Sequence, residues 1–431
     1  MITRRPRQLL ALAVISALLV ACSSGERSAA PRTRSTSTTT TTTRPGADSV
    51  LTIGQLAPLT GPIAIISDAF TVPVKLAVDE INLSGGVNGK PVGLVVADDG
   101  SVSATARTAV TSLIDTSHAD AIIGPSTSQA ALDLFTRPPT HRAVICSGSN
   151  SYGPISGPAR QNGFYFRTAP PDRLQASALA KLLIADGRTR PVVIAGRDDY
   201  GLPFGTDVVR SLVAQHATGA RLISLRAGDA GANRAASEAL ARQPDAVVLI
   251  GFPDGIAPVL RVLIAQGKGP TQIPTYGSDG LQNAELGALV DPANPAVVAS
   301  MKGTSPAGAP AGIDHPFNAR LFAAGVEPFF SASTYDCVVL IALAAVAARS
   351  DDPRAIRDHF AKNLTGKTSC TTFLACSDEL RRRKAIHYHG ASSSFDHWAG
   401  SEPGDGAFDV WTLGLDARPT LAPPAQQVHV P

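Results

Sequence analysis

Continuous apolar runs alternate with helical periodicity throughout residues 50–431. Apolar positions recur at helical spacing over 74–81 and 106–114, which predicts amphipathic helices with one face in a core. Short apolar runs without polar interruption predict strands that are buried on both faces, as in parallel sheets covered by helices. These runs are residues 94–97, 121–123, 192–195 and 246–250. The alternation predicts an α/β protein of right-handed, doubly wound βαβ units, and its length favours two lobes over a single core.

The N-terminus has the pattern of a bacterial lipoprotein export signal. Arg4, Arg5 and Arg7 precede an apolar run over 9–19, which is too short to span a bilayer as a helix. Residues 19–22 read Leu-Val-Ala-Cys, a lipobox, so we expect cleavage before Cys22 and attachment of lipid to its thiol. An ordinary cleaved signal, in which Cys22 has no special role, remains the alternative. Residues 1–21 are therefore predicted to be a lipoprotein signal peptide.

Residues 22–48 are polar and include an unbroken threonine run over 38–43. Such a segment buries too little apolar surface to offset its conformational entropy, so it is predicted to be a disordered Ser/Thr-rich tether. Residues 1–49 hold seven Arg, one Glu and one Asp, a net charge of +5. Because the whole chain carries +3, residues 50–431 carry 3 − 5 = −2. This near-neutral charge offers no basic field for nucleic acid.

The cysteine content fits an exported protein. Cys370 and Cys376 are close in sequence within a polar stretch, and we expect them to form a disulfide. Their spacing matches no common zinc motif. Cys146 ends an apolar strand and Cys337 lies in an apolar helix. We interpret these two as separate small buried residues, with a second disulfide as the alternative.

Several motifs together carry a resemblance to a known family. Residues 53–62 read IGQLAPLTGP, and LAVDEIN, GGVNGKPVGLVVADD and ADAIIGP follow within residues 76–125. Further motifs recur in familiar order over residues 166–172, 198–201, 244–247, 276–280, 335–336, 386–392 and 408–411. The chain resembles the leucine/isoleucine/valine-binding family of ABC-transporter substrate-binding proteins, the branched-chain amino acid type of type I periplasmic binding protein. The resemblance covers essentially all of residues 50–415.

The resemblance implies two doubly wound lobes with parallel sheets, joined by three crossovers. It assigns residues 50–168 plus 304–388 to an N-terminal lobe. It assigns residues 169–303 plus 389–418 to a C-terminal lobe, which leaves 419–431 as a C-terminal tail. Residues 166–172 resemble the first crossover, and residues 386–412 resemble the third crossover and the closing segment. Pro73 is expected to interrupt a helix that is usually longer.

A dipolar ligand needs protein partners for both of its charges, since desolvation would otherwise defeat binding. Hydroxyls and N–H groups where a strand leads into a helix suit a carboxylate. Two such loops follow apolar strands, and the resemblance implies that they hold the ligand's carboxylate. The residues are Ser126, Thr127, Ser149 and Asn150. Helix capping is the alternative for Ser126 and Thr127, and Asn150 replaces the threonine usual in the family.

The resemblance places the ligand's ammonium group near Asp279 and Tyr200. Asp279 stands where leucine-binding relatives have Glu, and Phe252 where relatives often have tyrosine. Asp172 is a further candidate at the mouth of the cleft. The alternatives are helix capping for Asp172 and Asp279, the latter before a helix over 281–290, and surface packing for Tyr200.

Other polar groups give weaker signals. His387 and His389 alternate along a predicted strand and should share a face, with His397 nearby. Because no third ligand follows a metal-site pattern, we interpret them as surface histidines and predict no metal site. The pair Asp98-Asp99 is interpreted as turn and cap residues. No phosphate loop, nucleophile elbow or HExxH motif is present in the sequence, so we predict that the chain is not an enzyme.

The sequence therefore predicts an extracytoplasmic solute-binding lipoprotein without a cofactor, anchored to the bacterial membrane through Cys22. It would be a monomer that captures an amino acid or similar small ligand and delivers it to an ABC permease. The alternative is a ligand-sensing or partner-regulating lipoprotein of the same fold without a role in transport. The departures at Asn150, Asp279 and Phe252 leave the ligand open.

Overall fold

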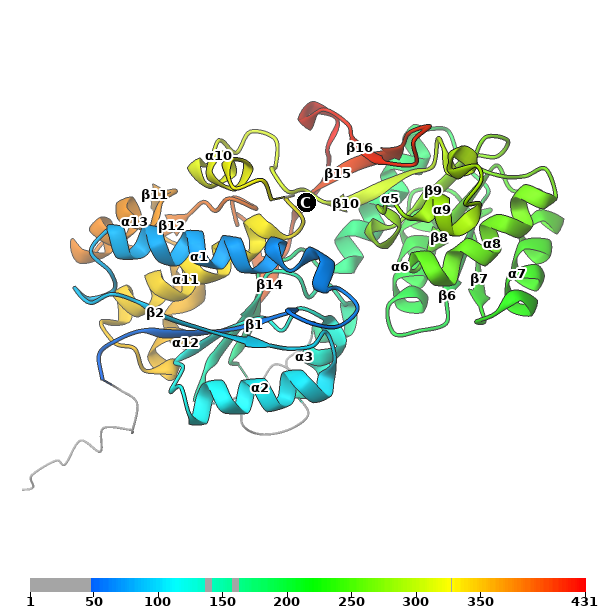
Figure 1. The fold of residues 1–431 in the computed structure, drawn as a ribbon. Coiled ribbons are helices and arrows are strands. Elements are labelled where there is room, and N and C mark those ends of the chain that lie inside the picture. Colours follow the sequence, from blue (N-terminus) through cyan, green and yellow to red (C-terminus); the bar gives the residue numbers. More distant parts are fainter. Residues whose placement is uncertain (1–47, 136–141, 157–162, 327) are drawn as a thin grey trace, which may run out of the picture. The chain divides into compact units, whose positions relative to one another are not determined.

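Two separate β-sheets organise the folded chain (Figure 1). The structure is a computed structural model that describes residues 48–135, 142–156, 163–326 and 328–431. The predicted signal peptide, Cys22 and all of the predicted tether except Asp48 lie outside the described residues. Each sheet with its covering helices is called a lobe below.

The sheet of the first lobe is fully parallel, with the strand order β2-β1-β3-β4-β5. Its strands are β1 (Thr52–Ala57), β2 (Gly93–Asp98), β3 (Ala121–Ile123), β4 (Val144–Ser147) and β5 (Tyr165–Arg167). This order reverses direction at β1 and β3, which is the doubly wound arrangement that the sequence predicts.

The sheet of the second lobe repeats that order and adds an antiparallel edge. Its parallel part runs β7-β6-β8-β9-β10, and β15 pairs antiparallel with β10. The strands are β6 (Pro191–Gly196), β7 (Arg221–Leu225), β8 (Ala246–Ile250), β9 (Thr275–Gly277), β10 (Lys302–Pro306), β15 (Gly406–Leu413), β16 (Pro419–Leu421) and β17 (Val428–Val430). A parallel sheet with an antiparallel edge strand is common in large α/β folds.

Helices cover both faces of each sheet. The first lobe contains α1 (Asp68–Leu83), α2 (Ser103–Asp115), α3 (Ser128–Phe135), α10 (Pro316–Ala323), α11 (Ser331–Ala348), α12 (Pro353–Phe360) and α13 (Phe373–Arg381). The second lobe contains α5 (Asp172–Ala185), α6 (Gly201–Ala214), α7 (Asp229–Ala241), α8 (Pro253–Ala265) and α9 (Leu286–Val290). The predicted apolar faces of α1 and α2 are buried as expected.

Strand alternation divides the core of each lobe into two layers. On β8, Val247 and Leu249 pack in the layer that includes α7 and α8. Val248 and Ile250 pack in the opposite layer, with α5 and α6. Successive side chains of a strand point to opposite faces, so a continuous apolar run serves both layers. The predicted strands over 121–123, 192–195 and 246–250 have this double burial.

The run over 94–97 forms a strand, but the prediction of burial on both faces is wrong there. β2 is the edge strand of the first sheet, and the side chains of Val95 and Val96 are 37% and 44% exposed. The sequence pattern alone cannot distinguish an edge strand from a central one, because position in the sheet is set by long-range pairing.

Pro73 does not shorten its helix, contrary to expectation. α1 continues through it from Asp68 to Leu83. A proline removes the N–H that would bond four residues back and pushes that carbonyl away. The Ser331 hydroxyl donates to the Ala69 carbonyl at 3.1 Å, and the Gln55 side chain donates to the Phe70 carbonyl at 2.9 Å. Partners from elsewhere in the lobe thus compensate for the proline.

Two predicted lobe boundaries and the tail need correction. Residue 304 lies inside β10, which belongs to the second sheet, so that boundary falls after Pro306. Residues 389–405 belong with the first lobe, since Phe395 and Trp398 pack in its core. The predicted tail, 419–431, contains β16 and β17, which both pair with β15. The predicted helix over 281–290 is only the short α9, preceded by a 3-10 turn (η4, Asp279–Leu281).

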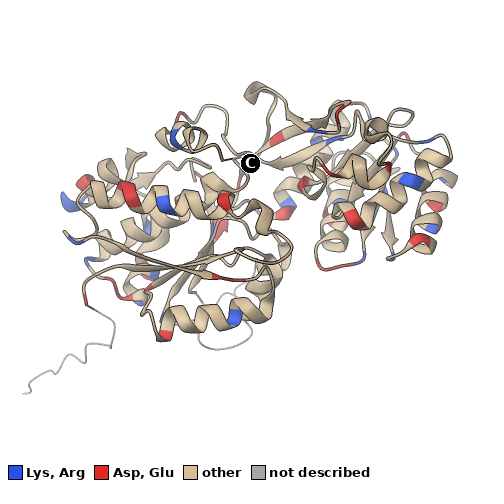
Figure 2. Ribbon diagram, in the orientation of Figure 1, with Lys and Arg blue, Asp and Glu red and all other residues tan. Residues whose placement is uncertain are grey.

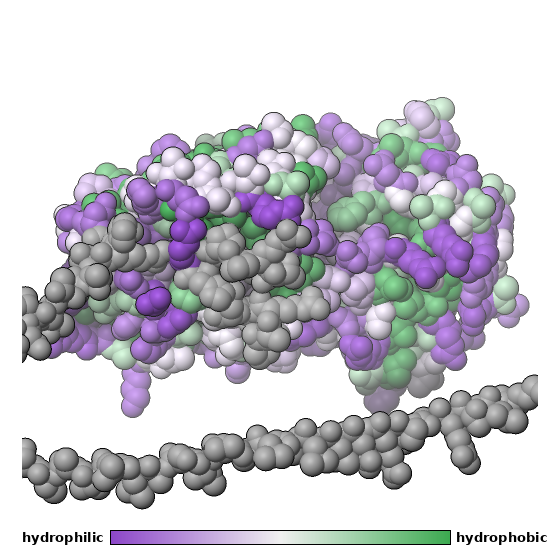
Figure 3. All heavy atoms as spheres, turned by 90° about the horizontal axis from the view of Figure 1, so that it is seen from below, coloured by the Kyte–Doolittle hydropathy of each residue, from purple (hydrophilic) through white to green (hydrophobic). Residues whose placement is uncertain are grey.

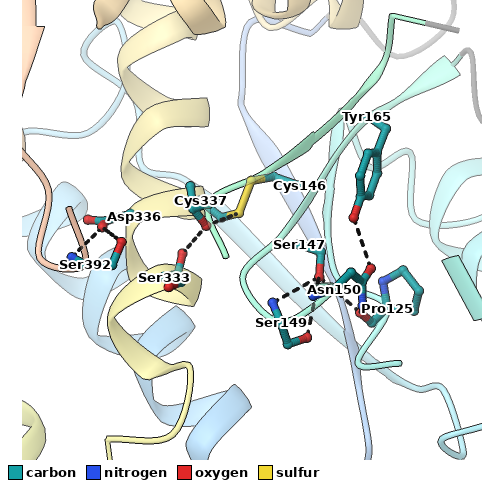
Figure 4. Close-up of a disulfide and its surroundings, with 11 residues drawn as sticks. Pro125, Cys146, Ser147, Ser149, Asn150, Tyr165, Ser333, Asp336, Cys337 and Ser392 are labelled. Atoms are coloured by element: carbon teal, nitrogen blue, oxygen red, sulfur yellow. Dashed lines mark hydrogen bonds between the residues drawn. A yellow bond between two sulfur atoms is a disulfide. The ribbon is translucent and has the colours of Figure 1, made fainter. Parts of the chain in front are cut away.

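Two disulfides lie in the first lobe. Cys370 and Cys376 have their sulfur atoms 2.13 Å apart, as the sequence predicts. Cys146 and Cys337 are also joined, with sulfur atoms 1.91 Å apart, so the interpretation as two separate buried residues is wrong and its alternative holds. This second bond ties β4 to α11 (Figure 4). The two cysteines are far apart in sequence, so their pairing depends on a helix packing that spacing does not reveal.

The surface agrees with the charge division of the sequence. Figure 2 shows Lys and Arg scattered among Asp and Glu over both lobes. On the face seen in Figure 3, hydrophilic residues surround smaller hydrophobic areas. Among the described residues, α11 is the one helix long and apolar enough to cross a membrane, but nearly all of it is buried in the first lobe's core. Burial of this kind is typical of a core helix.

The disulfides allow a test of the fold. Replacing Cys146 and Cys337 together with Ala should destabilise the first lobe by about 5 kcal/mol, because that bond closes a long loop in the unfolded chain. The matched double replacement of Cys370 and Cys376 should cost only about 2–3 kcal/mol in the same entropy model. Urea denaturation of both variants measures the order. An equal or reversed order would contradict the pairing described here.

Candidate functional site

The predicted site residues lie where parallel strands end or just beyond. In the first lobe, Ser126 and Thr127 follow β3, and Ser149 and Asn150 follow β4. In the second lobe, Tyr200, Phe252 and Asp279 follow β6, β8 and β9. The carboxyl ends of parallel strands are where open α/β sheets bind their ligands.

Ser126 and Thr127 have different roles in the loop after β3. The Ser126 N–H donates to Asp99 Oδ2 at 2.7 Å, while its buried hydroxyl has no hydrogen-bond partner. Thr127 caps α3 weakly, since the Ala130 N–H donates to its Oγ1 at 3.4 Å. Helix capping is therefore observed for Thr127 but not for Ser126. A buried hydroxyl without a partner is costly unless a ligand or water satisfies it.

Ser147 organises the loop after β4. Its hydroxyl accepts from the N–H groups of Ser149 and Asn150, both at 3.2 Å (Figure 4). Ser149 Oγ donates to the Ser126 carbonyl at 2.9 Å. Gly148 permits this path, because a Cβ there would lie 2.4 Å from the Thr334 backbone nitrogen. The two candidate loops are thus hydrogen-bonded to each other.

The side chain of Asn150 is fully engaged within the lobe. Its amide donates to the Pro125 carbonyl at 3.0 Å and its Oδ1 accepts from the Tyr165 hydroxyl at 3.2 Å. The Arg167 guanidinium donates to the Asn150 carbonyl at 2.9 Å. Asn150 is completely buried. In this arrangement the side chain of Asn150 holds the loop in place.

A hydrogen-bonded carboxylate forms the centre of the second-lobe site. Asp279 Oδ1 accepts from the Tyr200 hydroxyl at 2.8 Å and from Gln175 Nε2 at 2.9 Å. The Tyr200 hydroxyl also lies 2.8 Å from Ser278 Oγ, and Gln175 donates again to the Thr304 carbonyl. Asp279 Oδ2 receives no hydrogen bond from another described side chain. Backbone N–H groups of Asp279 and Gly280 also contribute hydrogen bonds to this carboxylate.

Electrostatics at this carboxylate favour a cationic partner. Burial raises the pKa of Asp279, while hydrogen bonds from Tyr200 and Gln175 lower it. Burial, followed by the nearby Asp279 charge, raises the pKa of Tyr200 well above its usual value. A cation beside Asp279 would offset the cost of holding its charge away from water. Asp279 begins the short η4 turn, so the alternative of capping a long helix is wrong.

Phe252 presents an aromatic surface beside this carboxylate. Its side chain is 57% exposed, although it contacts Tyr200 with ring centroids 5.1 Å apart. Tyr200 packs edge-on against the buried Phe204 with centroids 5.6 Å apart. The hydroxyl of Tyr200 is thereby fixed toward Asp279, and Phe252 is left available to contact an apolar group.

Asp172 is a deeply buried carboxyl group of the candidate site. It is 2% exposed. Burial raises its pKa to about 7, with the Ser151 hydroxyl lowering the pKa and the Asp279 charge raising it. Asp172 is the first residue of α5 and makes no side-chain cap, so the capping alternative lacks its hydrogen bond.

Sequence reasoning missed three residues that build the site. Gln175 donates a hydrogen bond to Asp279, and the Tyr200 hydroxyl donates to Ser278. Ser147 accepts hydrogen bonds that order the loop after β4. Gln175 could have been predicted from its spacing. It lies three residues after Asp172, and residues three apart share a helix face. The predicted turn role of Asp98 and Asp99 is confirmed by their bonds to backbone N–H groups.

The fold, two doubly wound lobes with polar groups at the carboxyl ends of their strands, is that of a solute-binding protein. Residues 50–379 match the family described as periplasmic binding protein. The chain therefore belongs to the periplasmic binding protein family, which the resemblance seen in the sequence predicts. The family consists of binding proteins rather than enzymes, in agreement with the sequence.

Two curated relatives illustrate the range of roles. A chemotactic signal transduction system substrate-binding protein, BasB, of Halobacterium salinarum is 26% identical over 87% of this chain and 90% of its own length. A Leu/Ile/Val-binding protein, BraC3, of Rhizobium johnstonii is 26% identical over 57% of this chain and 65% of its own length.

Solved structures confirm the fold. A leucine-binding protein from Thermotoga maritima has a TM-score of 0.66 at 20% identity, covering 88% of this chain and 99% of that one. A Streptococcus pneumoniae branched-chain amino acid binding protein in complex with isoleucine has a TM-score of 0.64 at 22% identity, with the same coverage. A solute-binding protein from R. palustris in complex with benzoate has a TM-score of 0.61 at 18% identity, covering 86% and 95%.

Asp172 makes a testable contribution to the pH dependence of stability. Between about pH 4 and 7 the folded protein keeps a proton on Asp172 that the unfolded chain has released. The contribution of Asp172 to the free energy of unfolding therefore falls as pH rises, by at most about 1.4 kcal/mol per pH unit. Asp172→Asn should be close to wild type at pH 4 and more stable above pH 7.

Urea denaturation across this pH range measures the difference. Asp229→Asn is the matched control, because Asp229 is also the first residue of a helix, α7, but is exposed. Its stability should follow that of wild type at every pH. A flat difference between Asp172→Asn and wild type would show that Asp172 is not held in its neutral form.

Proposed function

We propose that the protein is a lipid-anchored, extracytoplasmic solute-binding protein that captures a small dipolar ligand, an amino acid or a related compound, for an ABC importer. The observation that carries this proposal is the Asp279 carboxylate, held on one oxygen by Tyr200 and Gln175 beside the exposed ring of Phe252. A carboxylate oriented by fixed donors is suited to an ammonium group.

The ligand's carboxylate would be received by the first lobe. The buried Ser126 hydroxyl has no partner, and the Thr127 hydroxyl keeps its proton available while it caps α3. Both groups are fixed by the hydrogen bonds between the loops after β3 and β4. Hydroxyl donors in a pre-ordered loop can replace the water that a carboxylate loses on binding.

Binding would favour a closed state, as periplasmic binding proteins are known to do. One end of the ligand would contact the first lobe and the other end the second lobe. Only the closed state then offers both sets of contacts, so the ligand shifts the population toward it. Monomeric capture, lipid attachment at Cys22 and delivery to a permease complete the proposed role.

The ligand itself is a matter for experiment. Asp279 reaches one methylene less far than the Glu of leucine-binding relatives, and Phe252 replaces a hydroxyl with an apolar wall. The exposed Ile65 and the half-buried Ile63 shape a loop that is smaller and contains glycine in that family. These changes favour a ligand that is shifted, or differently shaped, relative to leucine.

A sensing role is the second candidate. The observation that favours it is the BasB relative, whose name assigns it to chemotactic signal transduction and which aligns with 87% of this chain. Affinity purification of the membrane-anchored protein distinguishes the two roles. Recovery of permease subunits supports transport, whereas recovery of a signalling receptor supports sensing.

Substitution at Asp279 tests the ammonium assignment. The ligand is first identified by thermal shift of the purified protein with each of the twenty common L-amino acids, amides, polyamines and small carboxylates. Asp279→Ala should then weaken its binding by about ten- to hundredfold, because a charge-assisted hydrogen bond is lost. Titration calorimetry measures the affinity.

Two matched variants sharpen this test. Asp279→Asn keeps the size of the side chain and should also lose most of the affinity, since the charge is removed. Asp229→Asn alters an exposed carboxylate of the same lobe and should bind like wild type. Unchanged affinity in Asp279→Ala would remove Asp279 from the site.

A further inference from the structure

Three side chains with metal-binding groups gather in the first lobe, outside the ligand site. They are His387 on β12 (Ile386–Tyr388), His389 immediately after it, and Asp396 in the following loop. Their imidazole nitrogen and carboxylate oxygen atoms all lie within 4.8 Å of one another. The histidines are half-buried and Asp396 is exposed. The sequence pattern indicated the two histidines but no third ligand. The fold brings Asp396 to them as a third candidate ligand.

Strand geometry brings the two histidines together. Residues two apart on a strand share a face, and the imidazole rings stack with centroids 4.6 Å apart. β12 pairs in parallel with β11 (Thr368–Cys370), so His387 lies opposite Ser369. The Cys370–Cys376 disulfide ties the end of β11 to α13. The strand that carries the two imidazoles is therefore paired with a strand that a disulfide holds to α13.

The loop after β12 turns back and carries Asp396 to the histidines. Asp336, which is buried, accepts from the N–H groups of Ala391 and Ser392 at 2.9 and 2.8 Å. Phe395 is fully buried and adopts a left-handed backbone, with φ of 55°. These two anchors fix the loop on both sides of its turn. Asp396 Oδ1 comes to lie 3.5 Å from His387 Nε2.

We propose that His387, His389 and Asp396 bind a divalent transition-metal ion of the zinc or copper class. Two imidazoles and one carboxylate form a donor set suited to such ions, whereas calcium and magnesium prefer oxygen ligands alone. The three protein ligands leave further coordination positions to water. A bound ion would join β12 to the loop that leads into β15.

The existing contacts require only a small adjustment. Metal–nitrogen bonds of about 2.0–2.1 Å require the ligand atoms to approach to roughly 3.3 Å in a tetrahedral site. The exposed Asp396 side chain can make this movement by a rotamer change. His387 lies 3.1 Å from the Ser394 carbonyl and His389 lies 3.3 Å from Ser369 Oγ. Both contacts are made by Nε2, so each ring has Nδ1 for a metal while they persist, and metal binding through Nε2 would displace them.

Calorimetric titration of the untagged, chelator-treated protein with zinc chloride tests the proposal. Wild type should bind one equivalent of Zn²⁺ with a Kd of about 10 μM or tighter, and magnesium chloride should give no binding. His389→Gln and Asp396→Asn should each weaken binding at least tenfold. His429→Gln, an exposed histidine on β17, is the matched control and should bind like wild type.

A second measurement guards against effects on folding. Zn²⁺ should raise the thermal midpoint of wild type and of His429→Gln, but not that of the two site variants, which should melt like wild type without metal. Co²⁺ bound to wild type in place of Zn²⁺ should give a visible absorption spectrum typical of cobalt bound by nitrogen and oxygen ligands. The proposal is overturned if wild type binds Zn²⁺ no tighter than about 1 mM, or if both substitutions leave the affinity unchanged.

Discussion

The buried ion pair between Arg167 and Glu402 is the constraint on which the first lobe's half of the candidate site depends. Arg167 is completely buried, and its guanidinium donates to Glu402 Oε2 with Nε at 2.9 Å and a terminal nitrogen at 2.5 Å. The same guanidinium donates to the carbonyls of Asn150 and Tyr152. Losing one partner of such a pair leaves an uncompensated buried charge, which costs about 3–5 kcal/mol.

This ion pair joins three segments that matter for function. Arg167 is the last residue of β5, just before the chain enters the second lobe through Asp172. Glu402 lies in β14 (Glu402–Pro403), shortly before β15 returns to the second sheet. Asn150 belongs to the candidate carboxylate loop. The loop and the starting points of two crossovers are therefore held at one place, which keeps the first half of the site in order.

The two halves of the candidate site differ in chemistry. The first lobe offers hydroxyls in a loop network that is satisfied except for Ser126. The second lobe offers a carboxylate with fixed donors on one oxygen, and an exposed aromatic ring. Such a pair of surfaces is complementary to a ligand with a negative group at one end and a positive group at the other. The buried Asp172, whose pKa burial raises to about 7, adds a group whose charge responds to its surroundings.

Local pattern was sufficient for most of the fold. The continuous runs at 121–123, 192–195 and 246–250, and the helical faces of α1 and α2, depend on periodicity that neighbouring residues determine. The Tyr200–Asp279 pair could be anticipated only through family resemblance, because 79 residues separate its members. Ser278 and Gln175 hydrogen-bond to this pair, and the fold is needed to bring them there.

What the sequence could not predict depends on long-range contacts. The exposure of β2 follows from its place at the sheet edge, and the helix through Pro73 from donors on Gln55 and Ser331. The Cys146–Cys337 bond requires α11 to pack against β4. The tail becomes β16 and β17 because β15 offers them an edge. Each of these outcomes is set by a partner that is distant in sequence.

Capture of a dipolar ligand by both lobes is tested most directly by small-angle X-ray scattering. The purified protein is measured with and without a saturating mixture of the twenty common L-amino acids, and binding is verified by calorimetry on the same sample. Closure of two lobes around a bound amino acid predicts a smaller radius of gyration in wild type, and in Asp279→Ala the same decrease only at ten- to hundredfold higher ligand concentration. Verified binding with an unchanged radius of gyration in wild type would contradict capture between the lobes.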